Sequence, residues 1–333
     1  MDNLEELTLK IENLIESEKT HHPDNIKVLK PSNSKMILQI LKNFKLKKTK
    51  EPVPKAEMIF LGAPTGAGKD TLVRKIMTDN PDKNYVVLNM DMFRPYYSRI
   101  TGDEEQISDS EYAVKTNQVS YEIYYIIQEL ILKEFPGTNI IVTGTMRDLD
   151  WVKEIISRYK NDYKTHYSTS LATLAVPIKE SAFSIFERYL RLVNTRGNSK
   201  APLRYTDLDY HNDTVRKFSS NVLYFEQDLH SNKATSFFDS IKVYRRNKDI
   251  SDLAEDTLVY DSKTSSPSES ATSHIQNIMH SSEKIDNARL FEILDLIAKN
   301  SDYLKSQQLF KSILTDLQDI SPQLGKHLED YSK

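Results

Sequence analysis

The sequence contains no cysteine among its 333 residues. Disulfide bridges, thiolate zinc sites and cysteine nucleophiles are therefore excluded together. Long apolar runs are lacking too: the longest, residues 123–132, contains Gln128 and Glu129 and is too short and too polar to span a bilayer. The first 19 residues are acidic and have no apolar signal core. We therefore expect no membrane partner and a cytoplasmic location.

An excess of basic residues is also absent. Lys and Arg total 45 against 48 Asp and Glu, which gives a formal net charge of −3. Proteins that bind nucleic acids usually carry a basic excess, so the balance gives no support to a nucleic-acid partner. The length and the 38% hydrophobic content are enough for a large core with appendages, as in an intracellular enzyme.

Glycine is scarce, with eight in the chain, but three of them gather in residues 62–68. An apolar run at 58–61 predicts a buried strand, and apolar residues at helical spacing after Lys69 predict a helix. A strand, a glycine turn, a lysine and a helix form a phosphate-binding P-loop, because backbone N–H groups and the helix N-terminus converge on phosphate oxygens. The pattern predicts ATP contacts from these residues: Thr65, Gly66, Ala67, Gly68, Lys69, Asp70 and Thr71.

Two positions depart from the standard G-x-x-x-x-G-K-[ST] pattern. Ala63 replaces the first glycine, and Asp70 stands where a Ser or Thr normally offers a hydroxyl to Mg²⁺. Asp70 can bind Mg²⁺ through its carboxylate, since hard cations favour carboxylates, or Thr71 can supply the hydroxyl. We expect the metal at one of these two residues. The alternative, a glycine turn with a solvated lysine, is disfavoured by the flanking strand and helix.

The chain divides into a central α/β region and two helical extensions. Residues 55–262 alternate short apolar strands with amphipathic helices, which predicts a mostly parallel sheet flanked by helices. Residues 263–284 are rich in Ser and Thr and are predicted to form a linker. Residues 285–333 carry two apolar stripes that fit a helical hairpin, which can pack on the core or mediate self-association. The predicted strands are 58–61, 85–88, 139–142, 171–176 and 241–244.

Residues 1–54 form the N-terminal helical extension. Leu4, Leu7, Ile11 and Leu14 make an amphipathic stripe, which is usually core or a docking face for a partner helix. A run of five lysines near its end is read as a solvated face before the proline-containing joint to the central region.

Polar residues follow the predicted strands, at the sheet edge where parallel sheets bind ligands. Asp91 follows the second strand, where a carboxylate can accept a proton from a hydroxyl nucleophile or help to hold Mg²⁺. The alternative for Asp91 is a helix N-cap. Thr143, Thr145 and Arg147 follow the third strand and suit a polar substrate.

Four arginines follow the fourth strand: Arg188, Arg191, Arg196 and Arg204. Arginines on a segment that crosses a P-loop site act as clamps on the phosphoryl group in transfer. One exposed arginine alone would mean little, but the group favours a catalytic role.

Five segments together resemble the zeta toxins, the kinase components of epsilon/zeta-type toxin–antitoxin systems. The resemblance spans residues 58 to about 260. Its segments are LGAPTGAGKDTL, VVLNMDMFRPYY, IIVTGTMRD, LAVPIKESAFSIFERYLRL, and Arg204 seven residues before His211-Asn212.

The resemblance implies a P-loop kinase that uses ATP and Mg²⁺ to phosphorylate the 3′-hydroxyl of the sugar in UDP-N-acetylglucosamine. It places Asp91 on the family's catalytic aspartate and Arg188 and Arg204 on its two catalytic arginines. Thr143 stands where the family has a glutamate that contacts the sugar, and a hydroxyl cannot accept hydrogen bonds with a charge. The resemblance therefore leaves the identity of the phosphate acceptor open.

The resemblance also implies a helical antitoxin whose helix blocks ATP. Such a helix can come from a separate protein, or residues 1–54 can hold part of it in cis; alternatively, these residues simply cover the core.

Three functions remain open from the sequence. The first is a kinase of UDP-N-acetylglucosamine or a related nucleotide sugar. The second is a kinase of another small molecule, such as a nucleotide or dinucleotide, which Thr143 favours. The third is a binding module whose nucleotide controls a partner through the terminal helices, which the presence of Asp91, Arg188 and Arg204 disfavours.

Overall fold

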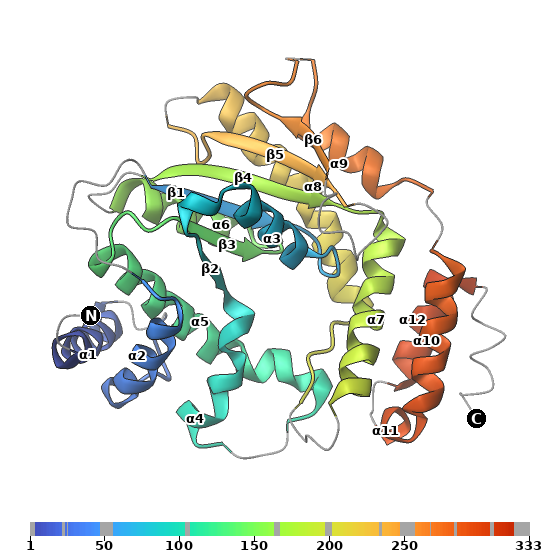
Figure 1. Ribbon diagram of the computed structural model, residues 1–333, viewed down its shortest axis with the longest axis horizontal. Coiled ribbons are helices and arrows are strands. Elements are labelled where there is room, and N and C mark those ends of the chain that lie inside the picture. Colours follow the sequence, from blue (N-terminus) through green and yellow to red (C-terminus); the bar gives the residue numbers. More distant parts are fainter. Residues whose placement is uncertain are drawn as a thin grey trace.

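A sheet forms the centre of the computed structural model, and helices pack around it (Figure 1). Among the described residues the sheet has six strands in the order β2-β3-β1-β4-β5-β6. The strands are β1 (Glu57–Gly62), β2 (Val86–Asn89), β3 (Ile140–Gly144), β4 (Ser168–Ala175), β5 (Ser240–Arg245) and β6 (Thr257–Asp261). The structure describes residues 4–21, 24, 26–46, 56–103, 107–162, 167–196, 202–232, 235–246, 257–266, 268–282, 285–306 and 310–322.

Strands β1 to β5 are parallel, and β6 runs antiparallel to β5 at the edge. The predicted mostly parallel sheet is confirmed, and each of the five predicted strands is present with its ends shifted by a few residues. The sequence analysis missed β6, because its short run carries an exposed Leu258 and lacks the buried apolar character of the other strands.

Helices cover the sheet and form both extensions. Asp148 and Asp207 begin two of them as caps that accept the backbone N–H groups of Trp151 and Tyr210. No helix in the described ranges is both long and apolar enough to cross a membrane. The α-helices are α1 (Leu4–His21), α2 (Ser34–Asn43), α3 (Lys69–Asp79), α4 (Tyr97–Thr101), α5 (Asp109–Glu134), α6 (Leu149–Ser157), α7 (Ile178–Thr195), α8 (Leu208–Ser231), α9 (Ala271–Met279), α10 (Asn287–Lys299), α11 (Ser301–Ser306) and α12 (Phe310–Ile320). Short helical turns are η1 (Pro31–Asn33), η2 (Pro81–Lys83), η3 (Met90–Tyr96) and η4 (Arg158–Asp162).

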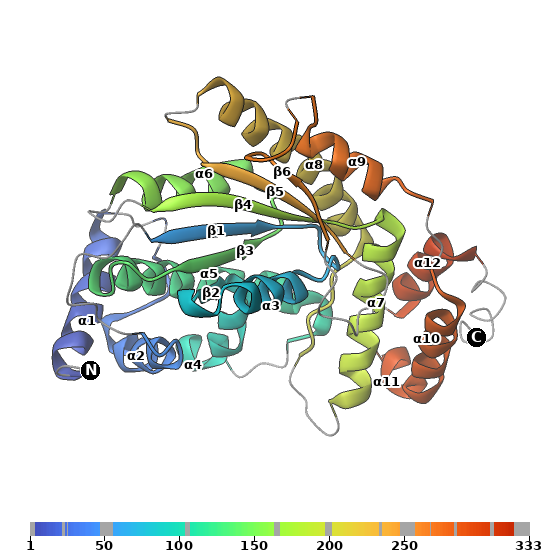
Figure 2. The same cartoon turned by 45° about the horizontal axis from the view of Figure 1, so that its top comes forward.

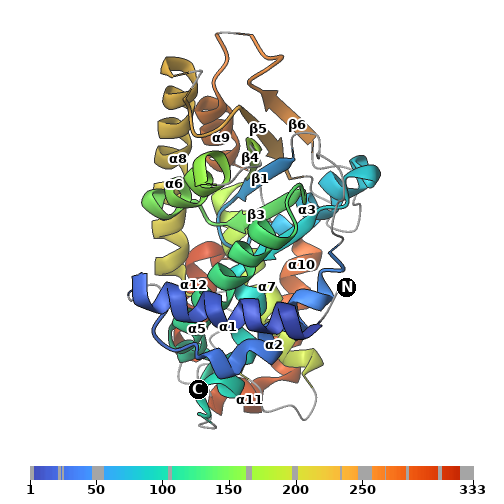
Figure 3. The ribbon, with the colours of Figure 1, turned by 90° about the vertical axis from the view of Figure 1, so that its left-hand side faces the viewer.

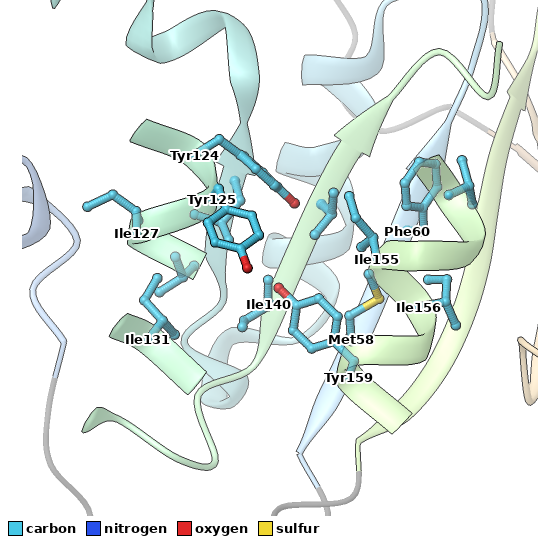
Figure 4. Close-up of a cluster of buried hydrophobic side chains, with 14 of the residues drawn as sticks. Met58, Phe60, Tyr124, Tyr125, Ile127, Ile131, Ile140, Ile155, Ile156 and Tyr159 are labelled. Carbon is cyan, nitrogen blue, oxygen red and sulfur yellow. The ribbon is translucent and has the colours of Figure 1, made fainter. Parts of the chain in front are cut away.

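Both faces of the sheet are buried, as parallel strands require. In β1, Met58 and Phe60 lie in the main core cluster with side chains of α5 and α6 (Figure 4). Ile59 and Leu61, on the opposite face, pack in a second cluster that includes Leu72 of α3. The central strand is thereby fixed from both sides, and so is the loop that follows it.

The N-terminal extension is part of the main core. Leu7, Ile11 and Ile15 of α1 are buried in the main cluster, and α1 and α2 lie beside α5 (Figure 3). Glu122 of α5 is fully buried and accepts the backbone N–H groups of Lys27 and Leu29 at 2.8 and 2.7 Å. Leu7, Ile11 and Leu14 of the predicted stripe therefore cover the core, which is the simpler of the two roles that its sequence allowed, whereas Leu4 at the start of the helix is exposed.

The C-terminal extension packs on α7. Ile293 of α10 and Leu317 of α12 are fully buried in a cluster with Phe183, Phe186 and Leu190 of α7. Packing on the core is one of the two arrangements that the sequence analysis left open for residues 285–333.

The segment predicted as a linker, 263–284, contains helix α9, so the prediction is wrong for that stretch. Ile275 and Ile278 of α9 are buried in the main cluster. Glu226 of α8 is also buried and accepts the backbone N–H of Ala271, at 2.6 Å, and that of Thr272. The many serines concealed an apolar stripe at helical spacing, and a buried carboxylate from another helix fixes its first turn.

Candidate active site

The predicted strand, glycine turn and helix are present at the carboxyl end of β1. Gly66 and Gly68 have φ values of +80° and +90°, in the left-handed region that glycine enters without strain. A Cβ on Gly66 would lie 2.0 Å from the carbonyl oxygen of Ser181 in α7. The loop is therefore held against the first turn of α7, and only glycine fits at that contact.

Lys69 begins α3 and folds back over the loop. Its Nζ donates to the carbonyl oxygens of Ala63 and Pro64 at 3.1 and 3.3 Å. Burial, together with the nearby charges of Arg188 and Arg204, lowers the pKa of Lys69 to about 7. Positive charge is thus concentrated where the sequence predicts the phosphates of ATP.

A cavity of about 740 Å³ opens in front of the loop, a volume typical of small-molecule sites. Thr65 and Thr143 are among its lining residues, and the hydroxyl oxygen of each is buried without a hydrogen-bond partner. Buried polar atoms without partners favour a ligand that supplies them. The lining residues are Thr65, Gly66, Gly68, Lys69, Asp70, Thr71, Asn89, Asp91, Thr143, Gly144, Thr145, Ser184, Glu187, Arg188, Arg191, Leu192, Thr195, Arg204 and Arg246.

Asp91 lies on the cavity wall in η3, which follows β2. The cap of that turn is Asn89, whose side chain accepts the N–H of Asp91 at 2.9 Å. The carboxylate of Asp91 instead accepts hydrogen bonds from Arg204 and from Nε of Arg94, the latter at 2.8 Å. Asp91 is therefore not a helix cap, and its carboxylate is held between two guanidinium groups.

Arg94 fixes this carboxylate to α5. Its side chain is only 7% exposed, and Nη1 donates to the carbonyl oxygen of Ala113 at 2.6 Å and to Oγ1 of Thr116 at 2.9 Å. Burial lowers the pKa of Arg94. The sequence analysis missed this residue, although it follows Asp91 at a spacing that places both on one side of a helical turn.

Helix α7 forms another part of the cavity lining. Ser184, Arg188, Arg191 and Thr195 recur at helical spacing along the cavity. Arg188 is open to the cavity, yet the surrounding protein lowers its pKa and the charge of Asp70 opposes that effect. Burial likewise lowers the pKa of Arg204, the residue paired with Asp91. Three of the four predicted arginines, Arg188, Arg191 and Arg204, therefore line the same cavity as the P-loop. The fourth, Arg196, does not line it, and its guanidinium lies 4.6 Å from the ring centre of Tyr303 in α11.

Two further predicted site residues do not line the cavity. Ala67 is fully buried, and its N–H donates to the carbonyl oxygen of Pro64 within the loop. Nε of Arg147 donates to Asp213 of α8 at 2.6 Å, and its guanidinium lies 4.5 Å from the ring centre of Tyr210. Arg147 therefore ties the loop after β3 to α8, whereas Thr143 and Thr145 face the cavity as predicted.

Arg246 is a cavity residue that the sequence analysis missed. It follows β5, and Nη1 donates to the carbonyl oxygen of Gly66 at 3.2 Å and to Oγ of Ser184 at 3.3 Å. Parallel sheets bind ligands at the carboxyl ends of their strands, and this rule applies to β5 too. Applied to the residues after β5, it would have identified Arg246.

Asp70 and Thr71 suit a magnesium ion in their chemistry. Both line the cavity at the start of α3, and each offers a hard oxygen ligand. Among the described residues no group of three or more acidic or histidine side chains forms a ready metal cage. A Mg²⁺ ion bound here would therefore take most of its ligands from phosphates and water, as is usual for this ion.

Comparison with known families identifies the chain. The sequence profile described as Zeta toxin matches residues 42–264, about two thirds of the sequence. The chain belongs to the zeta toxin family. Members of this family are P-loop kinase-like toxins, which agrees with the P-loop after β1. The sheet with its flanking helices has the family's kinase fold.

A solved structure supports this fold, and a second one is reported beside it. A structure from the PezAT chromosomal toxin–antitoxin system of Streptococcus pneumoniae is 22% identical, covers 82% of this chain and 96% of its own, and has a TM-score of 0.55. A structure of AvrRxo1-ORF1:-ORF2 with ATP is 12% identical, covers 91% and 89%, and has a TM-score of 0.48. A comparison with curated proteins finds no match.

Proposed function

We propose that this member of the zeta toxin family is an ATP-dependent kinase that phosphorylates a sugar hydroxyl of UDP-N-acetylglucosamine or a related nucleotide sugar. The main support is the convergence of Lys69, Asp91, Arg188 and Arg204 on one cavity, since they come from four separate segments of the chain. A lysine on the P-loop, a carboxylate and arginines are groups that position the reactants and stabilise charge in phosphoryl transfer.

In this proposal the phosphates of ATP lie on residues 66–71 with Lys69 beside them. The acceptor hydroxyl gives its proton to Asp91 as its oxygen bonds to the γ-phosphorus, and the bond from that phosphorus to the oxygen it shares with the β-phosphate breaks to release ADP. Arg188 and Arg204 stabilise the charge on the phosphoryl group in transfer. Arg94 keeps the Asp91 carboxylate in place while Arg204 turns to the phosphoryl group.

Asp70 or Thr71 would hold a Mg²⁺ ion at the mouth of the P-loop. When bound, the ion neutralises the β- and γ-phosphate oxygens. The two residues are both within the cavity lining, so the proposal covers either one.

Thr143 favours a second candidate, a kinase of another small molecule such as a nucleotide or dinucleotide. Its buried hydroxyl has no partner and lies on the cavity wall with Thr145. A hydroxyl can donate one hydrogen bond and accept others, whereas the glutamate that stands there in the family is an acceptor with a full charge. The acceptor is therefore the part of the proposal that needs the most direct test.

We also propose an antitoxin as a protein partner. The support is membership of the zeta toxin family, and the Streptococcus pneumoniae structure likewise comes from a toxin–antitoxin system. The partner is proposed to act in trans, because no described residue of 1–54 lines the cavity.

An assay with radiolabelled ATP and a panel of acceptors tests the proposed reaction. UDP-N-acetylglucosamine should gain one phosphate, seen by mass spectrometry, with the wild-type protein and not with Asp91→Asn. Label on a nucleotide or dinucleotide alone would establish the second candidate. ATP binding without any phosphate transfer would support the third function, a binding module that nucleotide controls.

A further inference from the structure

Helix α10 reaches the cavity wall from outside the matched region of the family. The profile ends at residue 264, whereas α10 spans Asn287–Lys299. Figure 2 shows α10 beside α7, and Leu290 and Ile293 of α10 are buried in a cluster with Phe183 of α7. This apolar contact brings two charged side chains of α10 against α7: Arg289, and Glu292, which accepts a hydrogen bond from Arg191 at 2.7 Å.

Arg289 binds two carboxylates of α7 at once. Nη1 donates to Glu180 and Nη2 to Glu187, both at 2.5 Å, and the guanidinium lies 5.2 Å from the ring centre of Phe183. The side chain is 17% exposed. Burial opposes its charge, but hydrogen bonds to Glu187 and Glu180 outweigh that effect and raise the pKa of Arg289. The planar guanidinium suits this bridge, because its donors are fixed in direction.

Each carboxylate also holds an arginine of the cavity wall. Glu180 accepts a hydrogen bond from Arg246 at 3.4 Å, and Arg246 in turn donates to the carbonyl oxygen of Gly66 in the P-loop. Glu187 accepts a hydrogen bond from Arg191 at 2.9 Å. Arg246, Arg191 and Glu187 line the cavity. A chain of alternating charges therefore connects α10 to the P-loop.

We propose that Arg289 is a positioning residue of the nucleotide site, which acts through Glu180 and Glu187 on Arg246 and Arg191. The inference rests on the proposed nucleotide binding, and adds that helices outside the family's matched region complete that site. Without Arg289, both carboxylates lose a shared partner and keep only Arg191 and Arg246, so the cluster loses one positive charge and becomes more negative beside the cavity. Such charge repels phosphates and draws the wall arginines away from them, which we expect to weaken nucleotide binding about tenfold.

Equilibrium binding of a fluorescent, non-hydrolysable ATP analogue with Mg²⁺ tests this role in the full chain. Arg289→Met should raise the dissociation constant about tenfold. Arg289→Lys keeps the charge but can reach only one carboxylate well, so it should give an intermediate value. The double variant Glu187→Gln/Arg289→Met also removes one negative charge and should recover part of the lost affinity.

Two control variants of α10 separate this role from simple anchoring of the helix. Lys299→Met removes a charge that pairs with Asp295 on the exposed side. Ile293→Ala leaves a cavity in the packing against α7 without changing any charge. Both should keep the wild-type affinity for the analogue, and Ile293→Ala should lower the thermal unfolding temperature.

The outcomes distinguish the two proposals. Wild-type affinity in a folded Arg289→Met variant overturns the positioning role, as does equal weakening by Ile293→Ala. If Arg289→Met does not fold, Arg289→Lys decides, since wild-type affinity there contradicts the role. If the wild-type chain itself does not bind the analogue, the result contradicts the proposed kinase function, and this inference is then contradicted too.

Discussion

The two walls of the cavity are held in place by different means. The P-loop wall depends on backbone conformation and apolar packing, with Gly66 pressed against α7 and Leu72 buried under the sheet. The wall that carries Asp91 depends on polar contacts that join distant segments: Asp91 pairs with Arg204, and Arg94, which also pairs with Asp91, donates to Ala113 and Thr116 of α5. The conformation of the P-loop follows from a single stretch of sequence, although distant residues such as Arg246 also contact it. The position of the Asp91 carboxylate depends on tertiary structure alone.

This difference predicts two kinds of variant. Changes in the P-loop wall should impair nucleotide binding and turnover together. Changes around Asp91 should spare nucleotide binding and impair turnover, because the Asp91 carboxylate faces the acceptor hydroxyl in the proposed reaction.

The largest effect is expected from Lys69→Ala. Loss of this charge beside the β- and γ-phosphates should abolish phosphoryl transfer, by about a thousandfold or more, and weaken binding of an ATP analogue. Nζ of Lys69 contacts loop carbonyl groups and not the apolar core, so the fold should survive. Steady-state kinetics, analogue binding and circular dichroism measure the three quantities. Unchanged turnover would refute the P-loop assignment.

Asp91→Asn should cut turnover by at least about a hundredfold, the scale of the loss of a general base. The amide keeps the shape of the carboxylate, so binding of the ATP analogue should stay near the wild-type value. Equilibrium binding measured beside steady-state kinetics decides the question. A variant that loses stability but keeps its turnover would show that Asp91 serves the fold alone.

Arg94→Met should lower turnover about tenfold, because the Asp91 carboxylate then keeps Arg204 as a partner but loses its attachment to α5. The Michaelis constant for ATP should change little. Arg99→Met, in the exposed helix α4, is the matched control and should behave as wild type. If both variants lose activity equally, the attachment of Asp91 through Arg94 is not what matters.

The smallest expected effect is on the pH dependence of nucleotide binding. The pKa of Lys69 is lowered to about 7 in the free protein, whereas bound phosphates favour its charged form. Binding must therefore take up a proton above pH 7, and affinity should fall as pH rises from 7 to 9. Lys69→Arg stays charged and should lose this part of the dependence. Parallel slopes in the two proteins would contradict the assignment, since titration of the analogue itself affects both equally.

The sequence predicted those parts of the site that follow from local pattern and from sheet topology. The P-loop has its own residue spacing, and the rule of strand ends placed Asp91, Thr143 and Thr145 on the cavity. Arg147 follows the same strand as Thr143, but its guanidinium pairs with Asp213 of α8. No local sequence pattern shows whether such an arginine will bind a ligand or pair with a distant carboxylate.

The remaining features were not readable because their partners lie far apart in the chain. Arg289 meets Glu180 and Glu187 only after α10 has packed on α7. The two helical extensions show the same limit. An apolar stripe predicts that a helix packs against other residues, but only the tertiary structure shows which ones. Residues of α1 meet α5, whereas residues of α10 meet the cavity wall.

The central claim is that the cavity transfers phosphate from ATP to a nucleotide sugar. Incubation with ATP, Mg²⁺ and UDP-N-acetylglucosamine, followed by mass spectrometry, tests it most directly. The wild-type protein should add one phosphate to the sugar nucleotide and release ADP, and Asp91→Asn should form little or none of this product. An unmodified sugar nucleotide, with ADP absent or phosphate on another acceptor, would contradict the claim.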